Sequence, residues 1–133
     1  MTDRQMQIGE VAERTGLSLR TIRHYDEVGL VVPSARSKGG FRLYTEADVE
    51  RLMVVRRMKP LDFSLEETRD LLEITDRISS VDEPAAGEER DRLRERLDAY
   101  RKVADARCET LRAQLVAAED FAATLRRKLG AGS

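Results

Sequence analysis

Two arginines three residues apart are the clearest chemical feature of this sequence. Arg20 and Arg23 share one face of a predicted short helix, because residues at this spacing are neighbours on a helix surface. Thr21 and His24 lie beside that face. Ser18 begins the helix, where free N–H groups and the helix dipole favour a negatively charged group. Guanidinium and hydroxyl groups at such a place bind phosphate, so these residues indicate contact with a polyanion.

A second short helix is predicted immediately before this one. Ile8, Val11 and Ala12 recur at helical spacing within residues 7–15, and Gly16 follows where a left-handed residue ends a helix. Two short helices joined by Thr-Gly-Leu-Ser have the pattern of a helix-turn-helix, whose second helix enters the DNA major groove. An exposed helix face that happens to carry two arginines is the alternative interpretation.

Residues 35–45, ARSKGGFRLYT, predict a small basic hairpin beside these helices. Gly39 and Gly40 favour a tight turn, because both residues can adopt positive φ. The ring of Phe41 or Tyr44 is expected to pack the hairpin on the helices, and the phenol of Tyr44 is also placed to reach DNA. Such a hairpin forms a wing that contacts the sugar-phosphate backbone. The predicted DNA contacts on the wing are Arg36, Lys38, Gly40, Arg42 and Tyr44.

Two further helices follow the hairpin. Thr45 is the predicted N-cap of a helix that ends near Met58, and a Lys-Pro-Leu-Asp run breaks the chain after it. Ser64 opens a capping box, Ser-Leu-Glu-Glu, for a fourth helix that continues to Ile78. Residues 79–87, SSVDEPAAG, are rich in helix breakers and predict a linker.

The remaining chain predicts one long helix with an apolar seam. No Pro or Gly occurs from Glu88 to Leu129, and apolar residues recur at spacings of four and three with one stutter near Ala104–Cys108. A single helix cannot bury such a stripe, so a second copy or a fold-back is required. If a second copy covers the seam, the predicted dimerisation residues are Leu93, Leu97, Tyr100, Ala104, Cys108, Leu111, Leu115, Ala118 and Leu125.

These elements predict a mainly α-helical chain with two functional parts. The fold class is a winged helix-turn-helix head with a small β-hairpin wing, followed by a long C-terminal dimerisation helix. The predicted organisation is a DNA-binding domain over residues 1–78, a linker over 79–87, a coiled-coil helix over 88–129 and a tail over 130–133.

Composition narrows the class of protein further. The chain of 133 residues has a net charge of −1, yet residues 1–60 carry 11 basic and 8 acidic side chains, which fits a polyanion surface better than a membrane. No apolar run reaches the roughly 20 residues of a membrane-spanning helix, and no export signal opens the chain, so a cytoplasmic protein is expected. One His and one Cys do not make a multi-ligand soft-metal site, so neither a metal nor a cofactor is expected.

The motifs together resemble those of MerR-type transcriptional regulators. The resemblance rests on T-I-R-x-Y-[DE]-x-x-G-L, [FY]-R-x-Y and F-[ST]-L-E-E, which occur in this order within residues 7–75. It implies a bacterial homodimer joined by an antiparallel coiled coil, with two heads on a palindromic promoter site that the protein distorts, and RNA polymerase as a partner there. It also implies DNA contacts by Arg20, Arg23 and Tyr25 from the second helix and by Arg42 and Tyr44 from the wing.

Two positions depart from the family pattern. His24 stands where Tyr or Phe is frequent, and Asp62 stands where Gly is usual, although Asp tolerates left-handed φ better than most residues. Ser79 and Ser80 precede the long helix, at whose start metal-sensing relatives carry a cysteine. Neither an iron–sulfur cluster nor a separate effector-binding domain is expected. The inducer, the operator and the direction of regulation stay open.

Two functions other than transcriptional regulation are weighed for this architecture, a DNA-organising or recruiting role and an enzymatic one. A winged head on a coiled coil could also organise DNA or recruit a partner without regulating transcription. An enzyme is not expected, because His24 and Asp26 are two residues apart on a helix and point in different directions.

Cys108 is expected to pack as a small apolar residue in the seam. If two helices over 88–129 pair antiparallel in full register, Cys108 faces its own mate, and an interchain disulfide is the second interpretation.

Overall fold

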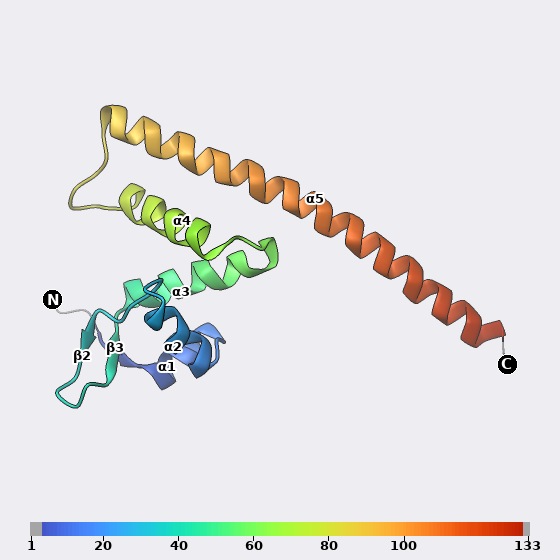
Figure 1. Cartoon of the computed structure of the whole chain (residues 1–133), viewed down its shortest axis with the longest axis horizontal. Helices are drawn as coiled ribbons and strands as arrows, with labels where there is room; N and C mark the ends of the chain where they lie inside the picture. The colour runs from blue at the N-terminus through green and yellow to red at the C-terminus, as the bar shows by residue number, and fades with distance from the viewer. Residues whose placement is uncertain (1–3, 132–133) are drawn as a thin grey trace. The chain divides into compact units, whose positions relative to one another are not determined.

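The computed structural model describes residues 4–131, which form two compact units, one up to Ala85 and one from Ala86. The chain is mainly α-helical with one small antiparallel sheet (Figure 1). The elements in order are β1 (Met6–Gln7), α1 (Ile8–Thr15), α2 (Leu19–Glu27), β2 (Ala35–Arg36), β3 (Arg42–Tyr44), α3 (Glu46–Met58), the 3₁₀ turn η1 (Lys59–Leu61), α4 (Leu65–Ile78) and α5 (Gly87–Ala131). The predicted fold class, a winged helix-turn-helix head followed by a long helix, is confirmed.

Local capping chemistry fixes where the helices of the head begin. Ser18 Oγ accepts a hydrogen bond from the backbone N–H three residues further on at 3.1 Å and so caps α2. Thr45 and Asp48 form a reciprocal capping box at the start of α3, and Ser64 and Glu67 form another at the start of α4. All three predicted N-caps are confirmed.

Left-handed residues end two elements of the head. Gly16, with φ of 72°, closes α1 and donates its backbone N–H to the Ala12 carbonyl at 2.9 Å. Asp62 follows η1 with φ of 56° and ψ of 39°. The expectation that Asp can occupy the left-handed position usually held by Gly is therefore confirmed.

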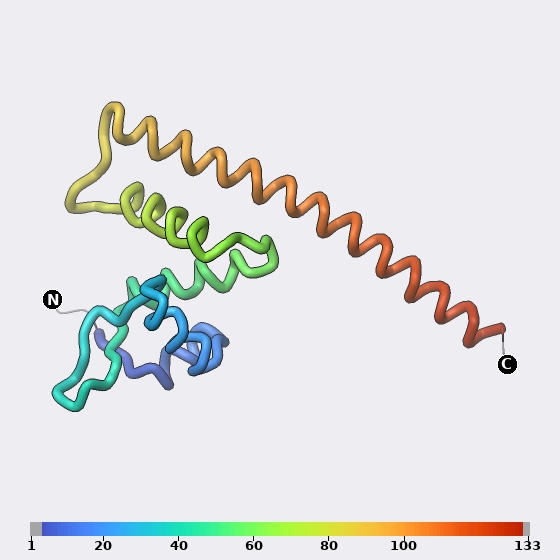
Figure 2. Tube along the Cα trace, in the orientation of Figure 1, coloured from blue at the N-terminus to red at the C-terminus, as the bar shows by residue number. Residues whose placement is uncertain are grey.

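The wing belongs to a three-stranded sheet rather than to an isolated hairpin. The strand order is β1-β3-β2, and Met6 of β1 pairs antiparallel with Tyr44 of β3. Gln7, expected within the first helix, is instead extended and serves as both strand residue and N-cap of α1. A two-residue strand is too short to show the alternation that marks strands in a sequence. Figure 2 shows the chain running out along β2 and returning along β3 to α3.

One apolar core holds the helices and the wing together. Its buried members are Met6, Val11, Leu17, Ile22, Tyr25, Leu30, Val31, Tyr44, Val49, Leu52, Val55 and Leu72. Tyr44, from the wing, has no exposed surface, whereas Phe41 is 68% exposed. Of the two aromatic rings that were expected to pack the wing on the helices, Tyr44 is therefore the one that does so.

The second unit is the single helix α5, whose 45 residues span about 68 Å at 1.5 Å per residue. It begins at Gly87 and continues to Ala131, so the expected helix bounds of 88–129 and the expected tail from residue 130 are corrected. Gly130 costs only about 1 kcal/mol relative to Ala in a helix, which is too little to end one this long. The last two residues of the expected tail lie outside the described residues.

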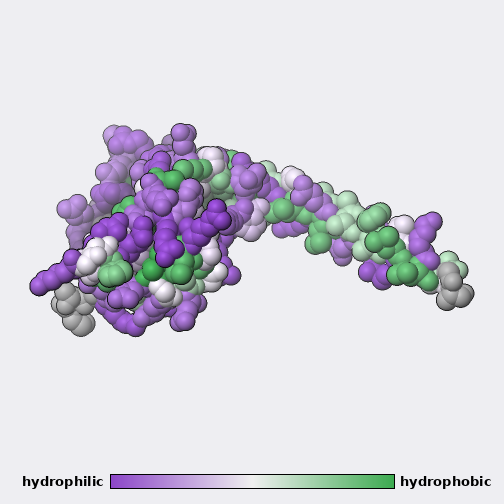
Figure 3. Space-filling model, turned by 60° about the horizontal axis from the view of Figure 1, so that its bottom comes forward, coloured by the Kyte–Doolittle hydropathy of each residue, from purple (hydrophilic) through white to green (hydrophobic). Residues whose placement is uncertain are grey.

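Much of the predicted seam of α5 is open to solvent. Leu111, Leu115 and Leu125 are 40%, 59% and 50% exposed, and Figure 3 shows apolar side chains along this helix. Cys108 is half-buried and forms no disulfide. Within the described range, no helix combines the length and the apolar character that crossing a membrane requires.

Candidate nucleic-acid interface

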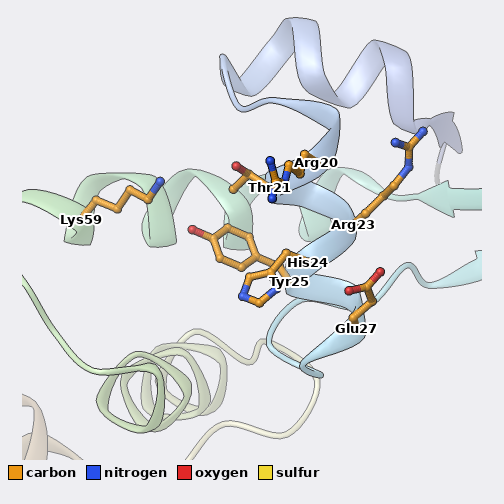
Figure 4. Close-up of a pocket in the computed structure, with 7 residues that line it drawn as sticks. All are labelled: Arg20, Thr21, Arg23, His24, Tyr25, Glu27 and Lys59. Carbon is orange, nitrogen blue, oxygen red and sulfur yellow. The ribbon is translucent and has the colours of Figure 1, made fainter.

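The outward side of α2 borders a cavity of about 710 Å³ (Figure 4). Its lining consists of Arg20, Thr21, Arg23, His24, Tyr25, Glu27 and Lys59. The first five are predicted DNA contacts, and the structure brings them to one surface. Ser18 lies at the start of the same helix, where its hydroxyl is committed to the N-cap and to the Thr21 hydroxyl at 2.9 Å.

Three cations and one carboxylate give this cavity a positive charge. Within residues 4–131, Arg20, Arg23 and Lys59 form no ion pair, and Glu27 is the acidic side chain of the lining. Unpaired guanidinium and ammonium groups around a concave surface attract phosphate. The cavity is therefore suited to a nucleic-acid backbone.

Lys59 is a member of this surface that sequence reasoning misses. In the sequence it belongs to the Lys-Pro-Leu-Asp run that ends α3, and no local pattern connects it with α2. Only the fold of the head brings its side chain to the cavity, where Figure 4 shows it reaching from a different helix. The position of Lys59 in this surface therefore follows from the tertiary fold and not from a local sequence pattern.

A second cavity, of about 240 Å³, joins α2 to the wing. It is lined by Gln7, Ile8, Arg23, Gly40, Phe41 and Arg42. Arg23 lines both cavities, so the surface of α2 continues onto the wing. The exposed ring of Phe41 extends this surface, although sequence reasoning treated the ring only as a packing residue.

The turn at the tip of the wing uses one left-handed glycine. Gly40 has φ of 82°, whereas Gly39 does not adopt positive φ, which corrects the expectation for the pair. The Gly40 backbone N–H donates to the Ser37 carbonyl at 2.9 Å, and the Ser37 hydroxyl accepts from the Phe41 N–H at 3.2 Å. Lys38 is exposed at this turn. The turn therefore presents a lysine and an open backbone to solvent.

The two wing arginines share one carboxylate of α2. Asp26 Oδ2 accepts from Arg42 Nε at 2.7 Å and from Arg36 Nη2 at 3.0 Å. The hydrogen bond to Asp26 raises the pKa of Arg42 above its ordinary value. Unlike the arginines of α2, both wing arginines are thus already paired within the chain.

The two predicted tyrosine contacts differ in position. Tyr25 is 8% exposed, and Figure 4 shows its hydroxyl on the side of the cavity that faces Lys59. Tyr44 is fully buried, and its hydroxyl has no hydrogen-bond partner in the described part of the chain. Desolvation raises the pKa of both phenols. Because Tyr44 offers no surface, the expected direct contact between Tyr44 and DNA does not fit this structure.

No group of three or more His, Cys, Asp or Glu side chains in the described residues could hold a metal ion.

Relatives of known sequence match about half of this chain. The HTH-type transcriptional activator mta of Bacillus subtilis is 43% identical to this chain over 67 residues. The HTH-type transcriptional regulator ZntR of Escherichia coli is 45% identical over 67 residues. The mercuric resistance operon regulatory protein of Bacillus cereus is 38% identical over 73 residues. These matches take up 50%, 50% and 55% of this chain but 26%, 48% and 55% of the relatives, so the chain spans about a quarter to a half of their length.

Solved structures match nearly the whole chain. MtaN, the N-terminal part of a Bacillus subtilis multidrug transporter activator, is 29% identical with a TM-score of 0.55, covering 93% of this chain and 97% of its own. HiNmlR, described as a MerR family regulator lacking the sensor domain and bound to promoter DNA, is 25% identical with a TM-score of 0.66, covering 88% and 80%.

The family descriptions agree with these likenesses. One, MerR HTH family regulatory protein, matches residues 6–74, and another, MerR, DNA binding, matches residues 49–128. The first takes in both cavities and the wing, and the second continues along most of α5. The chain belongs to the MerR family of helix-turn-helix regulatory proteins.

Proposed function

We propose that this protein is a sequence-specific, DNA-binding transcriptional regulator that binds a palindromic promoter site as a homodimer. The observation that carries the proposal is the continuous basic surface of α2, Lys59 and the wing, whose two cavities Arg23 joins. The relatives support it, since mta is a transcriptional activator and HiNmlR was solved on promoter DNA.

The two parts of this surface have different roles. The start of α2 carries Arg20, whose unpaired guanidinium is free to hydrogen-bond the edge of a guanine in the major groove. The wing carries Arg42 and Lys38, which hold the phosphate backbone beside that groove. Phosphate contacts fix the register of the head on the duplex, and base-edge contacts carry the sequence information.

Dimerisation is proposed from the exposed seam of α5. Leu115 and Leu125 are at least half exposed, and Leu129 is 80% exposed. Within its described residues, the unit that contains α5 has no second helix that could bury these side chains. Burial of apolar surface is worth about 25 cal/mol per Å², so pairing of two such helices as an antiparallel coiled coil is favourable. A second copy of the chain is the partner.

Regulation follows from two heads on one rigid coil. The coil fixes the distance between the heads, so the two half-sites must be brought to that distance, and DNA whose half-sites lie elsewhere is bent or twisted to fit. At a promoter, such distortion changes how RNA polymerase engages its two recognition elements. The protein is proposed to act in the bacterial cytoplasm, where the chromosome lies.

The test begins with in vitro selection of duplex DNA by the full chain, followed by footprinting and in vitro transcription. Arg20→Ala is expected to cost about 1–3 kcal/mol of binding to the selected site and to relax one base in each half-site. Lys38→Ala is expected to weaken binding to every duplex and to lower the slope of log affinity against log salt by about one. Lys102→Ala serves as the control for loss of one positive charge, because this exposed side chain of α5 lines neither cavity.

Three results bear on the proposal. Failure of the full chain to enrich any sequence would contradict sequence-specific binding. Equal losses for Arg20→Ala and Lys102→Ala would contradict the assigned role of α2. A selected site that is bound without any change in transcription would favour a DNA-organising protein instead.

A further inference from the structure

The end of α2 is tied to both strands of the wing by one carboxylate. Asp26 Oδ2 accepts a hydrogen bond from Arg42 on β3 and from Arg36 on β2, at 2.7 and 3.0 Å. These two arginines are partners across the β2–β3 pair. The Asp26 side chain is only 10% exposed, so the carboxylate is enclosed by the groups that it binds. Asp26 thereby fixes the position of the wing against the helix.

The same contacts divide the cations of the head into two classes. Arg36 and Arg42 share one negative charge, whereas Arg20, Arg23 and Lys38 have no ion pair within residues 4–131. The paired arginines also differ from each other: the Arg36 side chain is 49% exposed and that of Arg42 is 25% exposed. Arg36 also donates to the Gly40 carbonyl at 3.4 Å, so both wing arginines are held by hydrogen bonds within the chain.

We infer that Asp26 is a positioning residue that raises the ratio of operator binding to nonspecific DNA binding. This inference rests on the proposed function. The carboxylate offsets part of the wing's positive charge, which weakens attraction to any duplex, because nonspecific binding is almost entirely phosphate electrostatics. It also holds the wing at the position where backbone contacts and the base contacts of α2 are made together, which matters only on the operator.

A purely structural ion pair would behave differently. Removing it would lower the free energy of unfolding, but the folded fraction would bind operator and nonspecific DNA with the ratio of the parent. The ratio of the two affinities, measured on folded protein, therefore separates the positioning role from a structural one.

The experiment compares Asp26→Asn with Glu46→Gln in the full chain. Glu46 is a matched control, because it also bonds an arginine, Arg14, at 2.6 and 2.9 Å, and its loss changes the net charge by the same amount. Neither partner of that pair lines the two cavities. Affinity is measured by fluorescence anisotropy on the duplex selected by the parent and on a scrambled duplex of the same composition, from 50 to 200 mM salt. Circular dichroism reports the folded fraction.

Asp26→Asn is expected to bind the scrambled duplex roughly threefold more tightly at the low-salt end, with a salt slope steeper by about 0.9, as one released phosphate contact predicts. Its ratio of selected to scrambled affinity is expected to fall at least threefold, while Glu46→Gln keeps the ratio of the parent. An unchanged ratio for Asp26→Asn, or the same fall for both variants, would overturn the inference.

Two wing variants test the same idea without touching the carboxylate. Lys38→Gln removes an unpaired cation and is expected to lower the salt slope on the scrambled duplex by about one. Arg36→Gln removes a paired cation and is expected to lower it by less than half as much. Equal effects would overturn the inference even if Asp26→Asn does not fold. A parent that selects no sequence would instead overturn the proposed function, and this inference with it.

Discussion

The buried hydroxyl of Tyr44 gives the sharpest test of how the head is built. The ring packs in the core with no exposed surface, opposite Met6 in the β1–β3 pair, and its hydroxyl has no hydrogen-bond partner in residues 4–131. Tyr44→Phe removes one oxygen atom and keeps the ring. Because only the hydroxyl changes, the substitution separates packing from hydrogen bonding.

The magnitude follows from the cost of burying an unpaired polar group. A buried donor or acceptor without a partner costs about 1–3 kcal/mol, so Tyr44→Phe is expected to raise the free energy of unfolding by about 1 kcal/mol or more. Urea unfolding followed by circular dichroism measures it, at one fixed protein concentration because dimer dissociation contributes to the transition. The m-value is expected to stay unchanged. Affinity for the selected duplex is also expected to stay unchanged.

Tyr25→Phe is the matched control, since the hydroxyl of Tyr25 opens towards the first cavity. It is expected to weaken duplex binding and to change stability by less than about 0.5 kcal/mol. A destabilised Tyr44→Phe would show that the Tyr44 hydroxyl is hydrogen-bonded in solution. A Tyr44→Phe protein that binds DNA more weakly at full stability would show that this hydroxyl reaches DNA, and would refute the assignment of Tyr44 to the core.

Four further predictions concern other parts of the chain. Asp62→Gly is expected to raise the free energy of unfolding by up to about 1 kcal/mol, because a left-handed residue without Cβ is unstrained; urea unfolding checks it. The hydrogen bond from the Arg14 guanidinium lowers the pKa of Glu46 below its ordinary value. The ion pair therefore stabilises the fold fully at pH values above the ordinary pKa, and this stabilisation is lost as the pH falls through the lowered pKa. Glu46→Gln is expected to flatten this part of the plot of unfolding free energy against pH. Phe41→Ala is expected to weaken duplex binding without changing stability, because the ring is exposed. Leu111→Cys is expected to form an oxidised interchain dimer on non-reducing gels far more readily than the native Cys108.

The helices of the head could be predicted from the sequence because their boundaries are local chemistry. Ser18, Thr45 and Ser64 each cap a backbone N–H group in the next turn, so the pattern that predicts the helix start lies within four residues of sequence. The left-handed position of Asp62 is likewise set by its own backbone. Each of these features needs no partner from elsewhere in the chain.

The rest of the interface depends on contacts between distant residues. Lys59 reaches the first cavity, and Asp26 meets the wing, only through the tertiary fold. Arg42 and Tyr44 are two apart on one strand and so point to one side, which the sequence predicts, but what covers that side does not follow from alternation. The core covers Tyr44, while a carboxylate of α2 binds Arg42, so two positions on the same side of one strand have different environments.

The seam of α5 contains its own information about how two copies would pair. The described helix runs from 87 to 131 and its midpoint is residue 109, so pairing by helix ends no longer places Cys108 opposite its mate. A twofold dimer instead requires a seam that maps onto itself when reversed. The two ends of the seam meet this requirement, because the first three and the last three spacings are both four, three, four.

Reversal about Leu111 places apolar residues opposite each other at the centre and towards both ends of the seam, while Cys108 and Leu115 face Gln114 and Arg107. The resulting pairs are Leu93 with Leu129, Leu97 with Leu125, Tyr100 with Ala122 and Ala104 with Ala118, and Leu111 faces its own mate. A large ring then meets a small residue, as close packing requires. In this register the two Cys108 residues are six positions apart, or about 9 Å along the axis, which exceeds the roughly 7 Å between Cα atoms that a disulfide spans. A native Cys108 disulfide that formed as fast as one at position 111 would contradict this register and support one centred nearer to Cys108.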